Sequence, residues 1–138
     1  MSNMIQKLVI DQSGVPLLKK YLDVSSLRHK LISGNIANVS TPRYRSKDVD
    51  FHGELRKAIG NNGHISGKRT HPSHLPLGQS RQDEPEIIVD KSNARNGINN
   101  VDIDKEMGDL AQNQIYYSIG ARLLAKKFDG LKKAITSK

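Results

Sequence analysis

The sequence contains no cysteine, and this absence excludes a fold held together by disulfides. A chain without thiols can occupy a reducing or an oxidising compartment without redox hazard. Tryptophan is also absent, aromatic residues make up 4% of the 138 residues, and hydrophobic residues reach only 36%. Such a composition does not support a large closed core, and the length fits one modest domain.

Long apolar runs are lacking too, because no stretch approaches the roughly 18 apolar residues that a membrane-spanning helix needs. The first residues, MSNMIQKLVIDQSG, lack a basic region, a following apolar region and a small-residue cleavage site. We therefore predict no cleavable Sec signal peptide. Nucleotide-binding loops and catalytic arrangements of Ser, His or carboxylate side chains are likewise missing. The prediction is a protein that is not an enzyme, with no catalytic, cofactor-binding or metal-binding residues.

The strongest pattern that is present lies in the last third of the chain, residues 102–138, which we predict to form one long helix. Alternating steps of four and three residues pass through nine apolar side chains and one glutamine. A repeat of about 3.5 residues, kept over several heptads, is typical of a coiled-coil seam with a left-handed supercoil. The positions of this predicted seam are Ile103, Met107, Leu110, Gln114, Tyr117, Ala121, Leu124, Phe128, Leu131 and Ile135.

A second apolar patch on the same helix lies outside the predicted seam and comprises Ile115, Tyr116, Ile119 and Leu123. A helix that is apolar on two sides is expected to be buried on two sides. Because the sequence offers no third long helix, we predict that another subunit covers this patch. Self-association, or co-assembly with similar chains, is therefore the leading structural inference.

Residues 1–40 form an N-terminal helical segment, in which Pro16 to Val39 is the expected partner of the C-terminal helix. Within its apolar face, we predict that Arg28 reaches solvent along its stem and that Asn35 makes a register-setting hydrogen bond. Ligand binding by these two residues is the alternative. Weaker helical spacing indicates a short helix before this one, at Met4, Ile5, Leu8 and Val9. The apolar face consists of Leu17, Leu18, Tyr21, Val24, Leu31, Ile32, Asn35, Ile36 and Val39.

Residues 41–101 read as an irregular middle segment, which holds four of the five prolines. We predict a short helix near 51–59, a short strand at 86–90 and a mobile polar stretch between them. Candidate N-caps for the final helix are Asn99, Asn100 and Asp102. The predicted fold is mainly α, with long N- and C-terminal helices paired as an antiparallel coiled coil around an irregular, partly mobile middle.

The net charge of +8 is unevenly spread, with −4 over residues 82–106 beside +4 over 107–138. Adjacent blocks of opposite sign suit packing between copies as well as contact with phosphate. A solvated loop is the favoured interpretation of a basic stretch with interleaved Tyr44 and Phe51, at Arg43, Arg45, Lys47, Lys68 and Arg69. A metal site is the weaker interpretation of His64, His71 and His74, because loop histidines without cysteine ligands seldom form one.

Two motifs carry a family resemblance. The sequence S-G-N-I-A-N-V-S-T-P-R-Y at 33–44 resembles the signature S-x-N-I-A-N-x-x-T-P-G-Y of bacterial flagellar rod and hook axial proteins. The sequence K-D-V-D-F at 47–51 and the C-terminal N-N-V-D-I-D-K-E-M at 99–107 are similar to the proximal rod members of that family, as are L-A-Q-N-Q at 110–114 and L-L-A-K-K-F at 123–128. Arg43 stands where the family usually has glycine, so a turn that needs φ > 0 there would be strained.

The resemblance implies a structural subunit of the proximal rod of the flagellar basal body. Its terminal helices would pack as a coiled coil within a helical, tubular axial structure needed for motility. The implied partners are copies of itself, other rod proteins, the basal-body membrane ring and the export apparatus, with neither nucleic acid nor a small-molecule substrate. Export would use the flagellar type III apparatus, and assembly would take place in the periplasm.

Two other functions follow from the residues alone. A small basic nucleic-acid-binding protein is the first, and affinity that falls steeply with salt would distinguish it. An export chaperone or adaptor is the second, since a two-helix coiled coil suits that role. Chaperones rarely combine both motifs, so this alternative ranks last.

Overall fold

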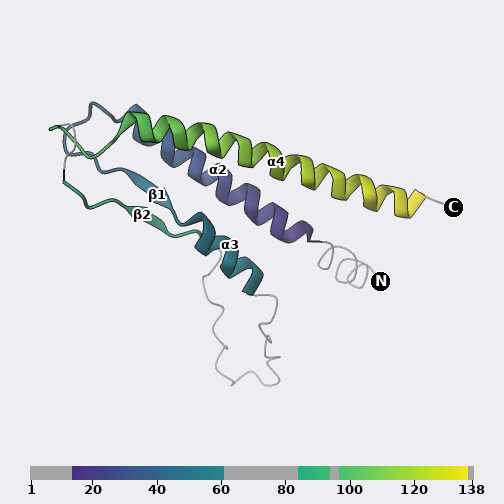
Figure 1. Ribbon diagram of the computed structural model, residues 1–138. Helices are drawn as coiled ribbons and strands as arrows, with labels where there is room; N and C mark the ends of the chain where they lie inside the picture. The colour runs from purple at the N-terminus through teal and green to yellow at the C-terminus, as the bar shows by residue number, and fades with distance from the viewer. Residues whose placement is uncertain (1–13, 61–83, 94–96, 137–138) are drawn as a thin grey trace, which may run out of the picture.

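The computed structural model describes residues 14–60, 84–93 and 97–136 (Figure 1). The short helix predicted around Met4–Val9, the three clustered histidines and the basic pair Lys68 and Arg69 lie outside these residues. The described elements are α2 (Val15–Ala37), β1 (Lys47–Val49), α3 (Phe51–Gly60), β2 (Ile87–Val89) and α4 (Ile103–Thr136). The structure is mainly helical, with the long helices near the two ends of the chain, as the sequence predicts.

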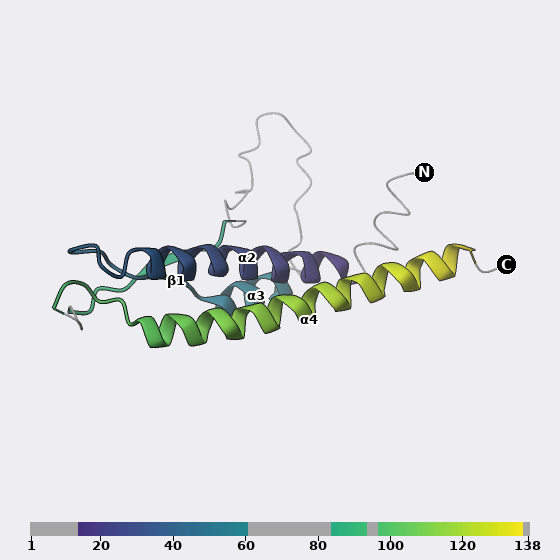
Figure 2. The same ribbon diagram turned by 90° about the horizontal axis from the view of Figure 1, so that it is seen from above.

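Helices α2 and α4 lie side by side and run in opposite directions (Figures 1 and 2). Three contacts define their register: Asn35 meets Glu106, Ser25 meets Asn113, and Tyr21 meets the backbone of Tyr116. As the contact moves toward the start of α2, it moves toward the end of α4. Because α4 is the longer helix, its last turns extend past the start of α2.

Local sequence sets the ends of both helices. Helix α2 starts after Gly14, which has φ 75°, and carries proline in its first turn, where the missing N–H costs no helix bond. It ends at Ala37, with Asn38 as its C-cap, before the predicted stop at Thr41-Pro42. Of the three candidate N-caps for α4, Asp102 accepts hydrogen bonds from the amides of Asp104 and Lys105, each at 3.2 Å. None of the helices in the described ranges is both long and apolar enough to cross a membrane.

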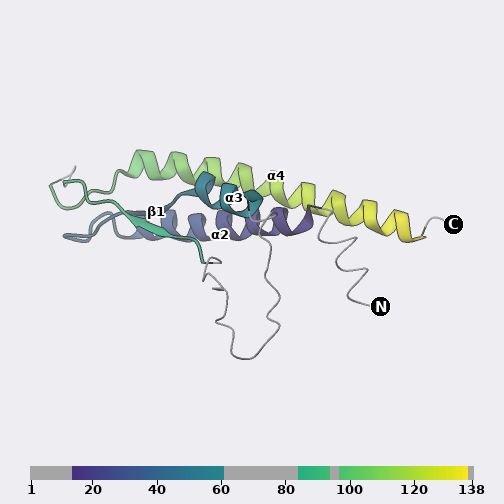
Figure 3. The same cartoon turned by 90° about the horizontal axis from the view of Figure 1, so that it is seen from below.

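Helix α3 and the two strands cover one side of the α2–α4 pair (Figure 3). A small core of Val24, Val49 and Phe51 joins α2, β1 and α3, and Tyr21 meets the Phe51 ring edge-on at 5.1 Å. Strands β1 and β2 pair antiparallel, with Asp48 opposite Ile88. Sequence reasoning found only the second of these strands, because Lys47-Asp48-Val49 is short and charged and gives no alternating apolar signal.

The face that α4 turns toward α2 is not the predicted seam. The buried residues of α4 are Glu106, Asn113 and Gly120, which repeat at the heptad interval but are polar or small. Four predicted seam positions are half-buried, namely Leu110, Ala121, Leu124 and Leu131. The prediction that the whole seam packs on α2 is wrong for six exposed positions, Ile103, Met107, Gln114, Tyr117, Phe128 and Ile135. The apolar pattern predicted the wrong line of contact because α4 carries more apolar side chains than one partner helix can cover.

The predicted apolar face of α2 does lie against the rest of the chain. Val24, Ile32 and Asn35 are buried, and of the remaining predicted positions only Leu17 is exposed. The half-buried members are Leu18, Tyr21, Leu31, Ile36 and Val39. The α2 prediction succeeded where the α4 prediction failed because α2 has covered sides toward α4, α3 and β1.

The close approach of the helices at Gly120 generates a stability prediction. A Cβ atom added there would lie 2.6 Å from Tyr21 Cε1, whereas one added at Gly108 would meet nothing within 4 Å. Alanine at either position gains about 1 kcal/mol of helix propensity, but overpacking at Gly120 costs about 1–3 kcal/mol. We therefore expect the free energy of unfolding of Gly120→Ala to be lower than that of Gly108→Ala.

Urea unfolding followed by circular dichroism measures both variants. The matched Gly108→Ala variant should exceed the wild type in stability, and Gly120→Ala should not. Equal stabilisation by the two substitutions would contradict the Tyr21 contact.

Candidate assembly interface

Asn35 occupies the centre of the polar contacts that join α2, β1 and α4. It is 2% exposed, and its side-chain amide makes four hydrogen bonds. Its Nδ2 donates to the Lys47 carbonyl at 2.9 Å and to Glu106 Oε1 at 3.1 Å. Its Oδ1 accepts from the Lys47 amide at 2.9 Å and from the Tyr44 hydroxyl at 3.2 Å. All donors and lone pairs of the side chain are thus used, which positions the three elements relative to one another.

Glu106 is the charged partner in this group and is only 6% exposed. Burial raises the pKa of the Glu106 carboxyl, and the Asn35 hydrogen bond opposes that shift in part. Desolvation and the nearby Glu106 charge also raise the pKa of the Tyr44 hydroxyl. The hydrogen bond from Asn35 therefore positions the Glu106 carboxylate, while burial disfavours its charged form.

Arg28 bridges β1 and α4, and its predicted exposure to solvent is wrong. Its guanidinium lies 3.2 Å from Asp48 Oδ1 through Nε and 3.4 Å from Asp109 Oδ1 through Nη2. Only 16% of its side chain is exposed. The two carboxylates compensate the cost of bringing an arginine into the apolar face of α2.

Asn99 and Asn100 connect the two sequence motifs. Asn99 Nδ2 donates to three carbonyls after α2, those of Asn38, Val39 and Thr41, at 2.8–3.1 Å. Asn100 Oδ1 accepts from the Ser46 amide at 2.9 Å. Motifs separated by some sixty residues are therefore one structural unit, in which buried amides satisfy the loop carbonyls.

Arg43 takes the conformation that its position in the motif requires. Its φ is 60°, in the left-handed region that favours glycine, and it is the single non-glycine residue with positive φ in the described ranges. Its amide donates to the Ile98 carbonyl at 3.1 Å, which fixes the turn against the second motif. The turn geometry expected of a glycine is thus kept despite the arginine side chain.

Two exposed apolar surfaces remain on α4. The outward strip, as we call it, consists of the exposed predicted-seam residues Ile103, Met107, Tyr117, Phe128 and Ile135. The lateral strip consists of Ile115, Tyr116, Ile119 and Leu123, with exposed fractions from 37% to 58%. Tyr116 also stacks on Phe51 at 6.5 Å, so the lateral strip borders α3. Side chains of this size, left in water in a row on a rigid helix, form a surface suited to a partner.

A recess lies beside Tyr117 of the outward strip. Its volume is about 240 Å³, and its lining residues are Ser26, His29, Asn113, Gln114 and Tyr117. Asn113 Nδ2 donates to the Ser25 carbonyl at 3.0 Å, while Asn113 Oδ1 and Ser25 Oγ are buried without a hydrogen bond in the structure. The helix contact is therefore polar at its middle.

The basic stretch partly serves the fold. Arg45 Nη1 donates to the carbonyls of Asp90 and Ser92, each at 3.4 Å, and Lys47 belongs to β1. Phe51 is buried in the small core. Over the ranges that the structure describes, no group of three or more His, Asp or Glu side chains could hold a metal ion.

Sequence reasoning missed Glu106, Asn113 and Gly120 as contact residues. A faint signal existed, since polar and small residues at heptad spacing can allow close helix approach. A prediction of the helix contact from apolar periodicity alone passes over polar and small residues such as these. Their role depends on partners brought from α2 and β1, which lie distant in sequence.

Comparisons with known proteins agree on one family. No family model matches the sequence. The chain is 38% identical over 125 residues to the flagellar basal body rod protein FlgB of Borrelia hermsii, covering 86% of this chain and 93% of that protein. It is 34% identical to FlgB of Borreliella burgdorferi, covering 87% and 93%. It is 37% identical to FlgB of Bacillus subtilis, covering 86% and 90%.

The strained turn yields one prediction. Arg43→Gly keeps the left-handed backbone but removes its cost, which is about 1–2 kcal/mol for a residue with a side chain. The greater flexibility of the unfolded chain offsets about 0.4–1 kcal/mol of this gain. We expect the free energy of unfolding to rise by up to about 1.5 kcal/mol. Arg43→Ala, which keeps the strain, is the control for side-chain loss in chemical denaturation. A larger gain from alanine than from glycine would contradict the backbone explanation.

The buried Glu106 carboxyl yields a pH prediction. Its folded pKa is raised, so the folded state binds the proton more tightly than the unfolded state does. Its contribution to stability is therefore complete below the unfolded pKa and is lost as the pH rises through the folded pKa. We expect Glu106→Gln to raise the unfolding free energy near neutral pH and to change it little near about pH 4.

Urea titrations at both pH values measure this difference. Asp129→Asn, which changes an exposed carboxylate of the same helix, is the control and should show no such dependence. If the free energy of unfolding of Glu106→Gln equals that of the wild type at both pH values, burial of the carboxylate does not have the proposed effect.

Proposed function

The chain belongs to the FlgB family of flagellar basal body rod proteins, and on that premise we propose that it is a self- and co-assembling subunit of the proximal rod. The family is one of structural rod components. In this proposal the protein transmits torque through packed helices and carries out no chemistry. The single observation that carries it is the pair of exposed apolar strips on α4.

The strips support assembly because their burial would be strongly favourable. Fully burying a large apolar side chain gains about 1.5–3 kcal/mol, and Ile115, Ile119 and Leu123 are each about half exposed. The buried members of the predicted interface, such as Val24 and Ile32, hold the chain together instead. The predicted interface residues thus have two roles, an internal one on α2 and an external one on α4.

In this proposal the described parts of residues 1–40, 41–101 and 102–138 act as one unit, since α2 contacts β1, α3 and α4. The partners are further copies, other rod proteins, the membrane ring and the export apparatus. The proposed location is the periplasmic part of the basal body, reached by flagellar export. The names of the relatives support the basal body and the rod.

Substitution of the lateral strip tests the function. Ile119→Asp with Leu123→Asp would place two carboxylates in the proposed contact, and an unpaired buried charge costs several kcal/mol. We expect self-association in sedimentation velocity to weaken by at least about tenfold and the encoding strain to lose swimming. Ala111→Asp, an exposed position of the same helix, is the matched control and should leave both unchanged.

Unchanged swimming with the double variant would sink the proposal, provided that circular dichroism shows a folded protein. Retention of the wild type on duplex DNA, falling steeply with salt, would instead favour the nucleic-acid-binding alternative.

A further inference from the structure

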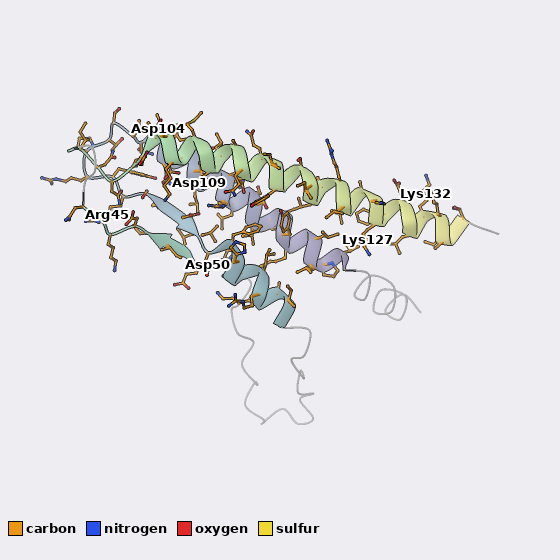
Figure 4. All side chains as sticks on the ribbon, viewed as in Figure 1. Arg45, Asp50, Asp104, Asp109, Lys127 and Lys132 are labelled. Atoms are coloured by element: carbon orange, nitrogen blue, oxygen red, sulfur yellow. The ribbon has the colours of Figure 1, made fainter. Side chains whose placement is uncertain are left out.

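Helix α4 continues past the point where α2 begins. The register of the two helices places Val15, the first residue of α2, beside about position 125 of α4, because both helices rise about 1.5 Å per residue. From there to Thr136, α4 extends roughly 16 Å further. Figure 4 shows these last turns, which carry Lys132, beyond the start of α2. Helix α2 is therefore too short to cover them.

The side of α4 that meets α2 stays apolar along these turns. Gly120 lies on that side, because a Cβ atom added there would touch α2. Leu124 follows Gly120 by four residues and Leu131 follows Leu124 by seven, spacings that keep side chains on one face of a helix. In the same row, Phe128 is 53% exposed and Ile135 is 81% exposed. The contact between the long helices thus has an apolar continuation beyond α2.

The part of the chain that precedes α2 joins it at this place. Residues 1–13 lie outside the described ranges, and their sequence predicts a short helix on the spacing of Met4, Ile5 and Leu8. A helix of that many residues is about 20 Å long, which matches the uncovered part of α4. The segment ends at Gly14, whose φ of 75° is the left-handed conformation in which many helices end. Length and point of attachment therefore both suit the uncovered turns.

We propose that residues 1–13 dock along the last turns of α4 of their own chain. Continuing the antiparallel register of α2 places Leu8 beside Leu131. The occupant is this segment because the chain itself delivers it to the start of the uncovered side. A segment joined through a short connection has an effective concentration in the millimolar range, which favours it over a second copy in dilute solution. The inference goes beyond the proposed function, because it concerns a single chain.

The absence of cysteine permits disulfide cross-linking as a direct test in the full chain. Leu8→Cys combined with Leu131→Cys should form a disulfide within one chain under mild oxidation, because the bond requires Cα atoms within about 7 Å. Ile10→Cys with Leu131→Cys is the matched control, since a helix would place Ile10 on the side opposite Leu8. We expect at least about fivefold less disulfide in the control pair.

Non-reducing electrophoresis after oxidation at about 1 µM and about 50 µM protein separates the two possible occupants. A disulfide within one chain should form to the same extent at both concentrations.

Hydrogen exchange tests the packing without a cross-link. Leu8→Asp should raise the exchange rates of the amides at 128–136 by about tenfold or more, because a helix end that loses its cover opens more readily. Ile10→Asp, the same change on the other side of the predicted helix, should leave those rates unchanged. The amides at 110–120, which lie beside α2, should exchange at wild-type rates in both variants and so show that the helix pair remains folded.

Equal cross-linking of the two cysteine pairs, or unchanged exchange at 128–136 in Leu8→Asp, would overturn the proposal. Disulfides that form only between chains would mean that a second copy covers this end of α4, which also contradicts it. The rod function is judged separately, by the swimming of strains with the lateral-strip substitutions, because that strip lies on a different side of α4.

Discussion

Four hydrogen bonds from one buried amide side chain are the interaction on which the fold depends. Asn35 satisfies both backbone groups of Lys47, the hydroxyl of Tyr44 and a carboxylate oxygen of Glu106, so α2, β1 and α4 are held at one point. Asn99 repeats this principle by satisfying three carbonyls after α2. A chain with little apolar core gains its unique arrangement from directed bonds, which tolerate less displacement than apolar contact does.

This arrangement leaves large apolar side chains of α4 exposed. The line of contact between the long helices passes through Glu106, Asn113 and Gly120, whose small or hydrogen-bonded side chains let the backbones approach. Large apolar side chains of α4 flank that line and stay in water in the single chain. A structure in which polar groups determine the internal fit and apolar groups point outward is suited to a subunit whose stability increases when neighbours cover it.

The length of α4 also makes the subunit asymmetric. The outward strip and the lateral strip lie on different sides of the helix, and its two ends differ in charge. Unlike surfaces on one subunit favour heterologous contacts, which extend without closing unless the rotation between copies completes a ring. The length of α4 therefore gives a single subunit several unlike surfaces.

The sequence by itself determined the two long helices, the apolar face of α2, the strand at Ile87–Val89 and the family, because periodicity and short motifs are local properties of the chain. It also indicated that α4 has more apolar surface than one partner covers. Only the tertiary structure decided which line of α4 meets α2, that Arg28 joins Asp48 and Asp109, and that β1 exists. Those features depend on partners distant in sequence, so that a buried glutamate or glycine gains its role only when the fold brings its neighbours to it.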